Sequence, residues 1–128
     1  MKPSPRRFTP ARQRAERRGR FAERFARWRL RLAGWRIVAR DWRCPAGEID
    51  LVARRGRVLA VIEVKSRPDA AAAAEALTRR QRRRIARAAE AFLLTRPDLA
   101  GLEVRFDVIL VAPRRLPRHW PAAWRAGD

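Results

Sequence analysis

The first regular pattern along the chain predicts a helix over residues 10–33, which Gly34 ends. Large apolar side chains recur along this segment at the spacing of a helix that turns by about 100° per residue. This stripe, which we expect to face the core, consists of Phe21, Phe25, Trp28 and Leu32. Glu23 lies outside the stripe, on a side of the helix that carries Ala22, Ala26 and Leu30.

Four strands are predicted where apolar residues alternate with polar ones or run together between turn residues. They cover residues 35–41, 48–54, 57–66 and 103–111. Cys44, Pro45 and Gly47 mark a turn between the first two strands. The pair Arg55-Gly56 stands between two apolar runs, which predicts a hairpin loop between the second and third strands.

A second helix is predicted after Thr78, which forms a capping-box pattern with Gln81. Its apolar side consists of Ile85, Ala88, Ala89, Phe92 and Leu93. Pro97 ends this helix, and the alanine-rich residues 68–77 before it are either a loop or an early helical turn. The order of helix, three strands, helix and strand indicates a mixed α/β or α+β domain.

The composition fits one domain of 128 residues, because 47% hydrophobic residues can form a core without staples. We expect a basic, flexible arm over residues 1–18 and a single domain over residues 19–128. Cys44 is the only cysteine, so no disulfide can form within the chain. No apolar segment follows the basic start, and no apolar run approaches the ~20 residues that span a bilayer. A cytoplasmic location without a membrane partner is therefore expected.

The formal net charge of +19 is the strongest bulk signal in the sequence. Such a surface attracts phosphate backbones and releases their counterions, which predicts a nucleic-acid partner. Lys2 and Lys65 are the only lysines among 32 basic residues, and the base composition of coding DNA also produces an arginine bias of this kind. An anionic membrane surface and a contact with the ribosome are the alternative explanations of the charge.

The predicted hairpin brings acidic residues together. A two-residue loop at residues 55–56 sets Asp50 opposite Val61, roughly 7–8 Å from its diagonal neighbour on the facing strand. Because side chains alternate between the two faces of a strand, four charged residues share one face of this pair. They are Glu48, Asp50, Glu63 and Lys65.

Carboxylates on apolar strands repel one another and resist burial, and a divalent cation with oxygen ligands compensates for both effects. Asp50 and Glu63 are candidate ligands of Mg²⁺ or Mn²⁺, with Glu48 as a third. Lys65 is placed to orient a water molecule or to hold a phosphate, so the set fits phosphodiester hydrolysis. The alternative is an ordinary strand pair whose acids form ion pairs with nearby arginines.

Two segments of the hairpin are specific, Gly47-Glu-Ile-Asp-Leu-Val and Val61-Ile-Glu-Val-Lys-Ser-Arg. They closely resemble the YraN family of small bacterial proteins. The resemblance covers about residues 19–124 and includes Gly19-Arg-Phe-Ala-Glu23, Gly34-Trp-Arg-Ile, Arg40-Asp-Trp-Arg-Cys44, Gln81-Arg-Arg-Arg-Ile, Arg105-Phe-Asp-Val and His119.

This resemblance implies an α/β fold of the restriction-endonuclease-like PD-(D/E)xK type, similar to archaeal Holliday-junction resolvases. The implied architecture is a mixed sheet of about four to five strands flanked by two main helices. The catalytic residues that it implies are Glu23, Asp50, Glu63 and Lys65. Similarity to resolvases would also imply a homodimer.

The second helix carries a basic face that is a candidate phosphate track, although a solvated surface explains it as well. The candidate nucleic-acid-binding residues are Arg79, Arg80, Gln81, Arg83, Arg84 and Arg87. Gln81 either closes the capping box or contacts substrate. We expect Asp107 to pair with an arginine and His119 to have a structural role, and we expect Trp120 and Trp124 to dock the tail.

The leading hypothesis is a metal-dependent, endonuclease-like protein that acts on DNA, including branched DNA. A first alternative is a module of the same fold that binds nucleic acid without cutting it. A second is an interaction protein of the ribosome or of a repair complex, with the basic arm as its contact. The retained acidic residues favour the enzyme, because a pure binder has no use for acids that face phosphate.

Overall fold

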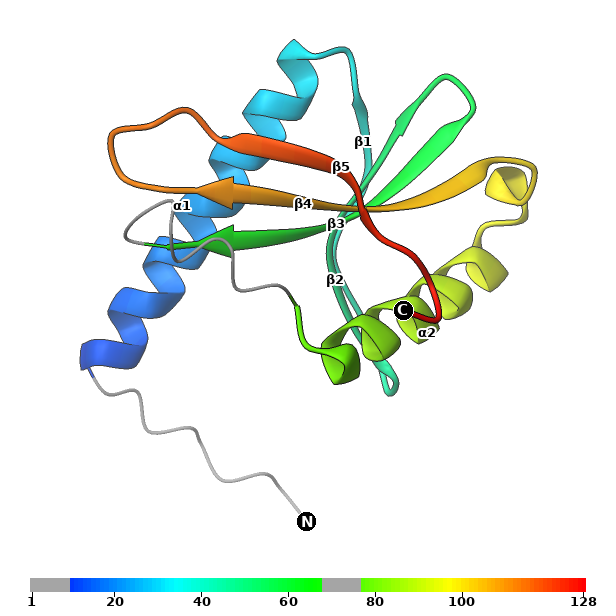
Figure 1. The fold of residues 1–128 in the computed structure, drawn as a ribbon, viewed down its shortest axis with the longest axis horizontal. Helices are drawn as coiled ribbons and strands as arrows, with labels where there is room; N and C mark the ends of the chain where they lie inside the picture. Colours follow the sequence, from blue (N-terminus) through cyan, green and yellow to red (C-terminus); the bar gives the residue numbers. More distant parts are fainter. Residues whose placement is uncertain (1–9, 68–76) are drawn as a thin grey trace.

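The computed structural model describes residues 10–67 and 77–128, with side chains from Arg20 onward. Five strands form one sheet in the order β1-β2-β3-β4-β5, and two helices flank it (Figure 1). The elements are α1 (Pro10–Leu32), β1 (Arg36–Cys44), β2 (Gly47–Arg55), β3 (Val58–Ser66), α2 (Arg79–Thr95), the short 3₁₀ helix η2 (Pro97–Leu99), β4 (Glu103–Val111) and β5 (Arg118–Trp124). Only β3 and β4 pair in parallel within this sheet, so the fold is the expected mixed α/β sheet.

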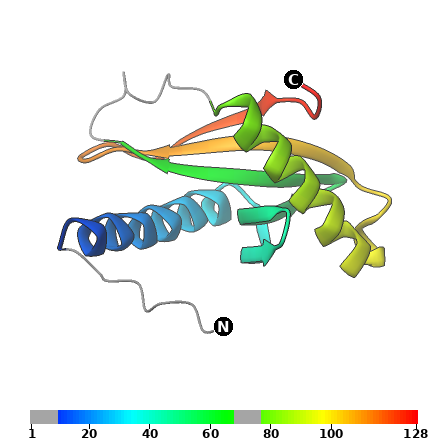
Figure 2. The same ribbon diagram turned by 90° about the horizontal axis from the view of Figure 1, so that it is seen from below.

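The two helices pack on opposite faces of the sheet (Figure 2). Leu59 and Val61 of β3 point into the core beneath α2, whereas Ala60 and Ile62 point into the core beneath α1. This alternation follows from the two-residue period of a strand. The strand segments at 57–66 and 103–111, predicted from sequence, are therefore central strands that are buried on both faces.

The buried side of α1 differs from the expected one. Phe21, Phe25, Trp28 and Leu32 are 56%, 49%, 47% and 66% exposed, so the prediction that they face the core is wrong. The helix instead packs through the small or aliphatic residues Ala22, Ala26 and Leu30. Large side chains already fill this layer, namely Trp35 just before β1 and Leu51, Ile62 and Ile109 of the sheet. The sheet therefore leaves room for a helix with a small-residue face.

The register of the β2–β3 hairpin also differs from the expected one. Arg55 pairs with Val58 and Val52 pairs with Val61, so the loop is Gly56-Arg57 rather than Arg55-Gly56. Gly56 has φ 60°, which suits the first loop position of a type II′ turn, where glycine is favoured. The pairing slides by two residues, and a slide of two keeps each side chain on its own face.

The C-terminal segment adds a strand that sequence patterning did not assign. β5 pairs antiparallel with β4 and forms an edge of the sheet, where the ring of Pro121 is tolerated. The ring of Trp124 stacks on that of Phe106, with a centroid distance of 4.1 Å. Trp124 is buried, which confirms that it docks this segment.

The start of α2 is fixed by two features. The backbone N–H of Gln81 donates to Oγ1 of Thr78 at 3.1 Å, and the N–H of Thr78 donates to Oε1 of Gln81 at 2.9 Å, which confirms the capping box. At Gly47 an added Cβ would lie 3.0 Å from the carbonyl oxygen of Arg84. The helix backbone therefore lies directly over the beginning of β2. Among the described residues no helix is long and apolar enough to cross a membrane.

Candidate acidic site across three strands

Three acidic residues stand side by side across β1, β2 and β3. Arg40 pairs with Leu51 and Trp42 with Ile49, so Asp41 stands opposite Asp50. On the other side of β2 the ladder with β3 ends at the pair of Leu51 and Ile62, and the next residues along the two strands are Asp50 and Glu63. Like charges that face each other across strands are destabilising, so the row requires compensation.

Asp50 and Glu63 are in contact. Oδ2 of Asp50 accepts a hydrogen bond from the backbone N–H of Val64 at 2.8 Å, and the carboxyl groups of Asp50 and Glu63 are within hydrogen-bonding reach. Nζ of Lys65 lies 3.4 Å from Oε1 of Glu63. The structure thus brings three of the four sequence-predicted catalytic residues together.

Glu23 reaches the same region from α1. Its side chain hydrogen-bonds with that of Asp41, and the charge of Asp50 is near enough to act on it. Glu23 is half-buried, on the flank of α1 next to the buried side formed by Ala22, Ala26 and Leu30. The functional position expected for Glu23 therefore depends on α1 packing through its alanine side.

Burial and mutual repulsion change the protonation of these acids. Burial, followed by the charge of Asp50, raises the pKa of Glu63 to about 8, although Lys65 opposes this effect. Burial, together with the hydrogen bond and the charge of Asp41, raises the pKa of Glu23 to about 7. Burial also raises the pKa of Asp50, against the hydrogen bond from Val64. The protonated form of Glu63 is thus favoured beside the Asp50 carboxylate.

The other described acids that form ion pairs have arginine or histidine partners. Glu48 lies 3.4 Å from Arg43, Asp98 lies 2.9 Å from Arg96, and Asp107 lies 2.9 Å from Arg105. Within residues 20–67 and 77–128 no arginine forms an ion pair with the carboxyls of the acidic row or with Glu23. Arg27 is close to Glu23, and its charge lowers the pKa of Glu23 against the larger effects of burial and Asp41.

The donor set fits a hard divalent cation, because carboxylate oxygens are the ligands that Mg²⁺ and Mn²⁺ prefer. Asp50 and Glu63 are the pair best placed to hold it. In the part of the chain that the structure describes, no three His, Cys, Asp or Glu side chains converge closely enough to form a metal site by themselves. A cation here would therefore replace the shared proton of Asp50 and Glu63 and keep water or phosphate oxygens as its other ligands.

Glu48 lies apart from this pair. Its side chain is 64% exposed and forms an ion pair with Arg43, its cross-strand partner on β1. Its charge still raises the pKa of Asp50, although burial and other groups act on Asp50 first. The structure therefore places Glu48 at the rim of the acidic site.

The arginines on the outer side of α2 are exposed, as the sequence predicts for a phosphate track. They are Arg79, Arg80, Arg83, Arg84 and Arg87. Gln81 is exposed as well, and its Oε1 is used in the capping box, which leaves its amide N–H groups for other partners. The helix thus presents a dense basic surface on the face of the sheet opposite α1.

A second charged cluster lies on β4 and β5 and is separate from the acidic row. The fully buried Asp107 accepts two hydrogen bonds from Arg105, each 2.9 Å long, and lies 2.7 Å from Nε2 of His119. It also accepts a hydrogen bond from the N–H of Ala122 at 2.9 Å. Both sequence expectations hold here, since Asp107 pairs with an arginine and His119 supports the edge strand.

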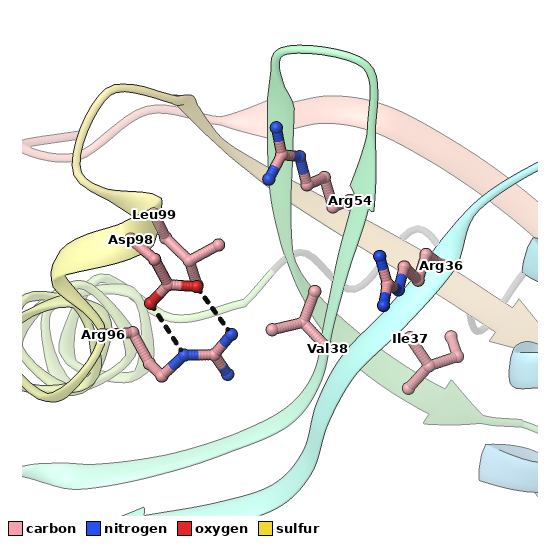
Figure 3. A pocket seen from close by; sticks show the side chains of 7 residues that line it. All are labelled: Arg36, Ile37, Val38, Arg54, Arg96, Asp98 and Leu99. Carbon is pink, nitrogen blue, oxygen red and sulfur yellow. Dashed lines mark hydrogen bonds and ion pairs between the residues drawn. The ribbon is translucent and has the colours of Figure 1, made fainter.

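A small basic pocket of about 250 Å³ lies near the loop end of the β2–β3 hairpin (Figure 3). Arg36 and Arg54, which are cross-strand partners, line it together with Arg96 and Asp98. Arg96 is held by two hydrogen bonds to Asp98, of 3.0 and 2.9 Å. No sequence-predicted site residue lines this pocket, so it is not part of the acidic site.

Sequence patterning missed Asp41. The signal that could have found it is the turn at Pro45, because pairing Cys44 with Gly47 sets Asp41 opposite Asp50 by simple counting. The exposed side chain and the φ of 49° at Asp41 interrupt the strand pattern, which is why alternation alone does not single it out.

Comparisons with known proteins all point to one protein family. The profile of the uncharacterised protein family UPF0102 matches residues 22–111. A UPF0102 protein of Paramagnetospirillum magneticum is 64% identical over 80 residues, which are 62% of each chain. A UPF0102 protein of Parvibaculum lavamentivorans is 62% identical over 81 residues, 63% of this chain and 61% of the relative. These alignments thus span about three fifths of either relative.

A UPF0102 protein of Maricaulis maris is similar over a longer stretch. It is 48% identical over 121 residues, which are 94% of this chain and 95% of that relative. Both the acidic row and the α2 arginines fall inside the matched region of the family profile.

Proposed function

The chain belongs to the uncharacterised protein family UPF0102, the YraN family that its sequence resembles, and we propose that it is a metal-dependent phosphodiester hydrolase acting on nucleic acid. The observation that carries this proposal is the set of carboxyl groups that face one another in a protein of charge +19. Acids that face one another without an arginine ion pair among the described residues are costly for folding alone, and they become useful when a cation and a phosphate enter.

Asp50 and Glu63 would hold Mg²⁺ or Mn²⁺. Such an ion lowers the pKa of a bound water and neutralises charge that develops on the phosphate. Lys65, 3.4 Å from Glu63, would hold a non-bridging phosphate oxygen as a compact cation. Lysine suits this position better than arginine, because its ammonium group can follow the phosphate in several orientations.

Glu23 would accept or donate a proton at the edge of the site. A carboxyl with a pKa near 7 can accept or donate a proton at neutral pH, which is what general acid–base catalysis requires. Its hydrogen bond to Asp41 fixes the orientation of the side chain. Asp41 is therefore a positioning residue for Glu23.

The arginine face of α2 supports nucleic acid as the substrate class. Exposed guanidinium groups at Arg80, Arg83 and Arg87 follow one side of the helix at three- and four-residue spacing, which suits successive phosphates of a backbone. DNA is the expected substrate, branched DNA included, and a homodimer would give paired cuts at a four-way junction.

A cleavage assay tests the proposal directly. Linear duplex, single-stranded, flapped and four-way-junction DNA, and a matched RNA, are incubated with Mg²⁺, Mn²⁺ or EDTA. We expect metal-dependent cutting by the wild type, and a loss of at least about 100-fold in Lys65→Ala with binding retained. Glu48→Ala, which removes an exposed acid at the rim, is the matched control and should keep most of the activity.

A second candidate is a module that binds nucleic acid without cutting it. It is favoured by the finding that no three ligands converge among the described residues. If all substrates are bound and none is cut with either metal, in wild type and in Lys65→Ala alike, the hydrolase proposal fails and the binding module remains.

A further inference from the structure

A large apolar groove lies between α1 and the loop that joins β4 to β5. It encloses about 590 Å³. Phe21, Phe25 and Trp28 form its α1 side, and Pro113, Leu116 and Pro117 form its loop side. In Figure 1 this loop and the arrow end of β4 lie beside α1. We call this feature the aromatic groove.

The rings of the aromatic groove are exposed to water, which is unfavourable for apolar side chains. Phe21, Phe25 and Trp28 are about half exposed, at 56%, 49% and 47%, and Leu116 is 71% exposed. A contiguous apolar surface of this kind marks a binding site more often than a structural need, because solvent-exposed rings gain nothing for the fold. The helix already has its core contacts through its alanine side, so among the described residues the rings are not needed for the core.

The charge around the groove restricts what can occupy it. Residues 20–32 of α1 contain five arginines and one glutamate, and Arg114 and Arg115 line the other side. A second copy of the same helix would bring like charges together. An anionic partner with flat apolar faces matches both the rings and the arginines, and the unpaired bases of a nucleic-acid strand have these two properties.

Two residues of the groove are next in sequence to residues of the acidic site. Ala22 and Ser66 line the groove, and these residues directly precede Glu23 and directly follow Lys65. Along the helix, Phe21, Phe25 and Trp28 rise by steps of about 6 and 4.5 Å, of the same order as the spacing of nucleotides along a strand. The spacing of the three rings therefore suits successive bases of one strand.

We propose that the aromatic groove binds the unpaired nucleotides of a nucleic-acid strand, by stacking bases on Phe21, Phe25 and Trp28 while the flanking arginines hold the phosphates. This inference rests on the proposed function in one respect, namely that nucleic acid is the substrate. It deepens that function by naming the substrate class, which is a nucleic acid with a single-stranded segment.

The test is a binding measurement in EDTA, so that cleavage plays no part. Fluorescence anisotropy compares a labelled single-stranded oligonucleotide with a blunt duplex of the same length, using the full chain. Trp28→Ala and Phe25→Ala are expected to weaken single-strand binding by about 5- to 100-fold each, and duplex binding by less than about twofold. Trp28→Phe should retain most of the affinity, because a ring still offers a stacking face.

Leu94→Ala is the matched control, since Leu94 is 85% exposed on α2, outside the groove. It should leave both affinities unchanged. Thermal unfolding of all variants checks that the fold is retained, which is expected because the substituted rings are half exposed.

Several results would overturn the inference. If the ring variants lose single-strand and duplex binding equally, the rings do not recognise unpaired bases. If single-strand binding is unchanged in these variants, the rings do not contact the nucleic acid. Binding of the wild type to anionic phospholipid vesicles that is lost in Trp28→Ala would assign the groove to a membrane. A wild-type dimer that dissociates in Phe25→Ala would assign it to self-association.

The outcome is separable from that of the hydrolase proposal. Ring-dependent binding of single strands without any cutting would leave this inference standing and end the hydrolase proposal. If Lys65→Ala abolishes cutting and the ring variants bind single strands as wild type does, the hydrolase proposal stands and this inference fails.

Discussion

Asp50 reaches from β2 to the backbone of β3, where its Oδ2 accepts a hydrogen bond from the N–H of Val64 at 2.8 Å. The carboxylate thus helps to hold the two strands together at the point where the backbone pairing of β2 with β3 ends. One side chain therefore has a structural contact and a candidate catalytic role, and substitutions must be chosen to separate them.

Asp50→Asn and Asp50→Ala should differ in stability and agree in activity. The asparagine oxygen can still accept from Val64, whereas alanine leaves a part-buried N–H without its partner, which costs about 1–3 kcal/mol. We expect Asp50→Asn to be more stable than Asp50→Ala by that amount in urea unfolding. Both should lose metal-dependent cleavage. Cleavage that survives in Asp50→Asn would remove Asp50 from the metal site.

Stability in EDTA should fall as the pH rises between 4.5 and about 8. The pKa of Glu63 is raised in the folded protein to about 8, mainly by burial and then by Asp50, so the folded state binds a proton that the unfolded state releases above 4.5. The melting temperature is expected to fall across this window. Glu63→Gln should flatten the fall and melt about 5 °C or more above wild type at the alkaline end.

Mg²⁺ or Mn²⁺ should oppose this fall, because the cation binds the deprotonated carboxyls and stabilises the folded state in proportion to its occupancy. The increase in melting temperature on adding metal should therefore grow with pH in wild type and vanish in Glu63→Gln. An increase of equal size in both proteins would place the cation elsewhere.

Asp107 should be essential for stability and dispensable for the acidic site. Asp107→Ala leaves the Arg105 guanidinium without the buried carboxylate, which we expect to cost about 3 kcal/mol in chemical denaturation. Burial opposes the charge of Asp107, but hydrogen bonds from His119 and Arg105 outweigh it and lower its pKa. The contribution is thus present above pH 3.8 and is lost as the pH falls through the lower folded value.

The exposed pair of Arg96 and Asp98 provides the control for that measurement. Asp98→Ala removes a carboxylate from the surface and should leave the midpoint of unfolding nearly unchanged. A similar decrease in the free energy of unfolding in both variants would mean that the burial of Asp107 does not increase its contribution to stability.

The arginines of α2 should set the salt dependence of binding. Replacing Arg80, Arg83 and Arg87 by alanine together is expected to reduce the slope of log affinity against log salt by about 3, because each phosphate contact releases about one counterion. The affinity should fall for duplex and single strand alike. Arg57→Ala, at the tip of the β2–β3 hairpin, is the control and should leave the slope as in wild type.

The sequence predicted the central elements of the fold with small errors. Residues 103–111 form β4 as expected, and the Thr78–Gln81 capping box begins α2. These features depend on local chemistry: strand patterning between turn residues, and a side chain that satisfies a free N–H of the first helical turn. The approach of Glu63 to Asp50 was also predicted, although from a register displaced by two residues. The prediction still holds because a shift of the pairing by two residues leaves each side chain on the same face of its strand.

The tertiary structure alone decided the features that depend on what packs against what. The sequence offers α1 two apolar sides, and the large rings form the stronger pattern. Only the space left by Leu51, Ile62 and Trp35 selects the alanine side and turns the rings outward. The same packing brings Glu23 to Asp41, a contact between a helix and an edge strand that no periodicity encodes. Local spacing determined the elements and the hairpin acids, whereas the volume and orientation of the layers determined which side chains meet.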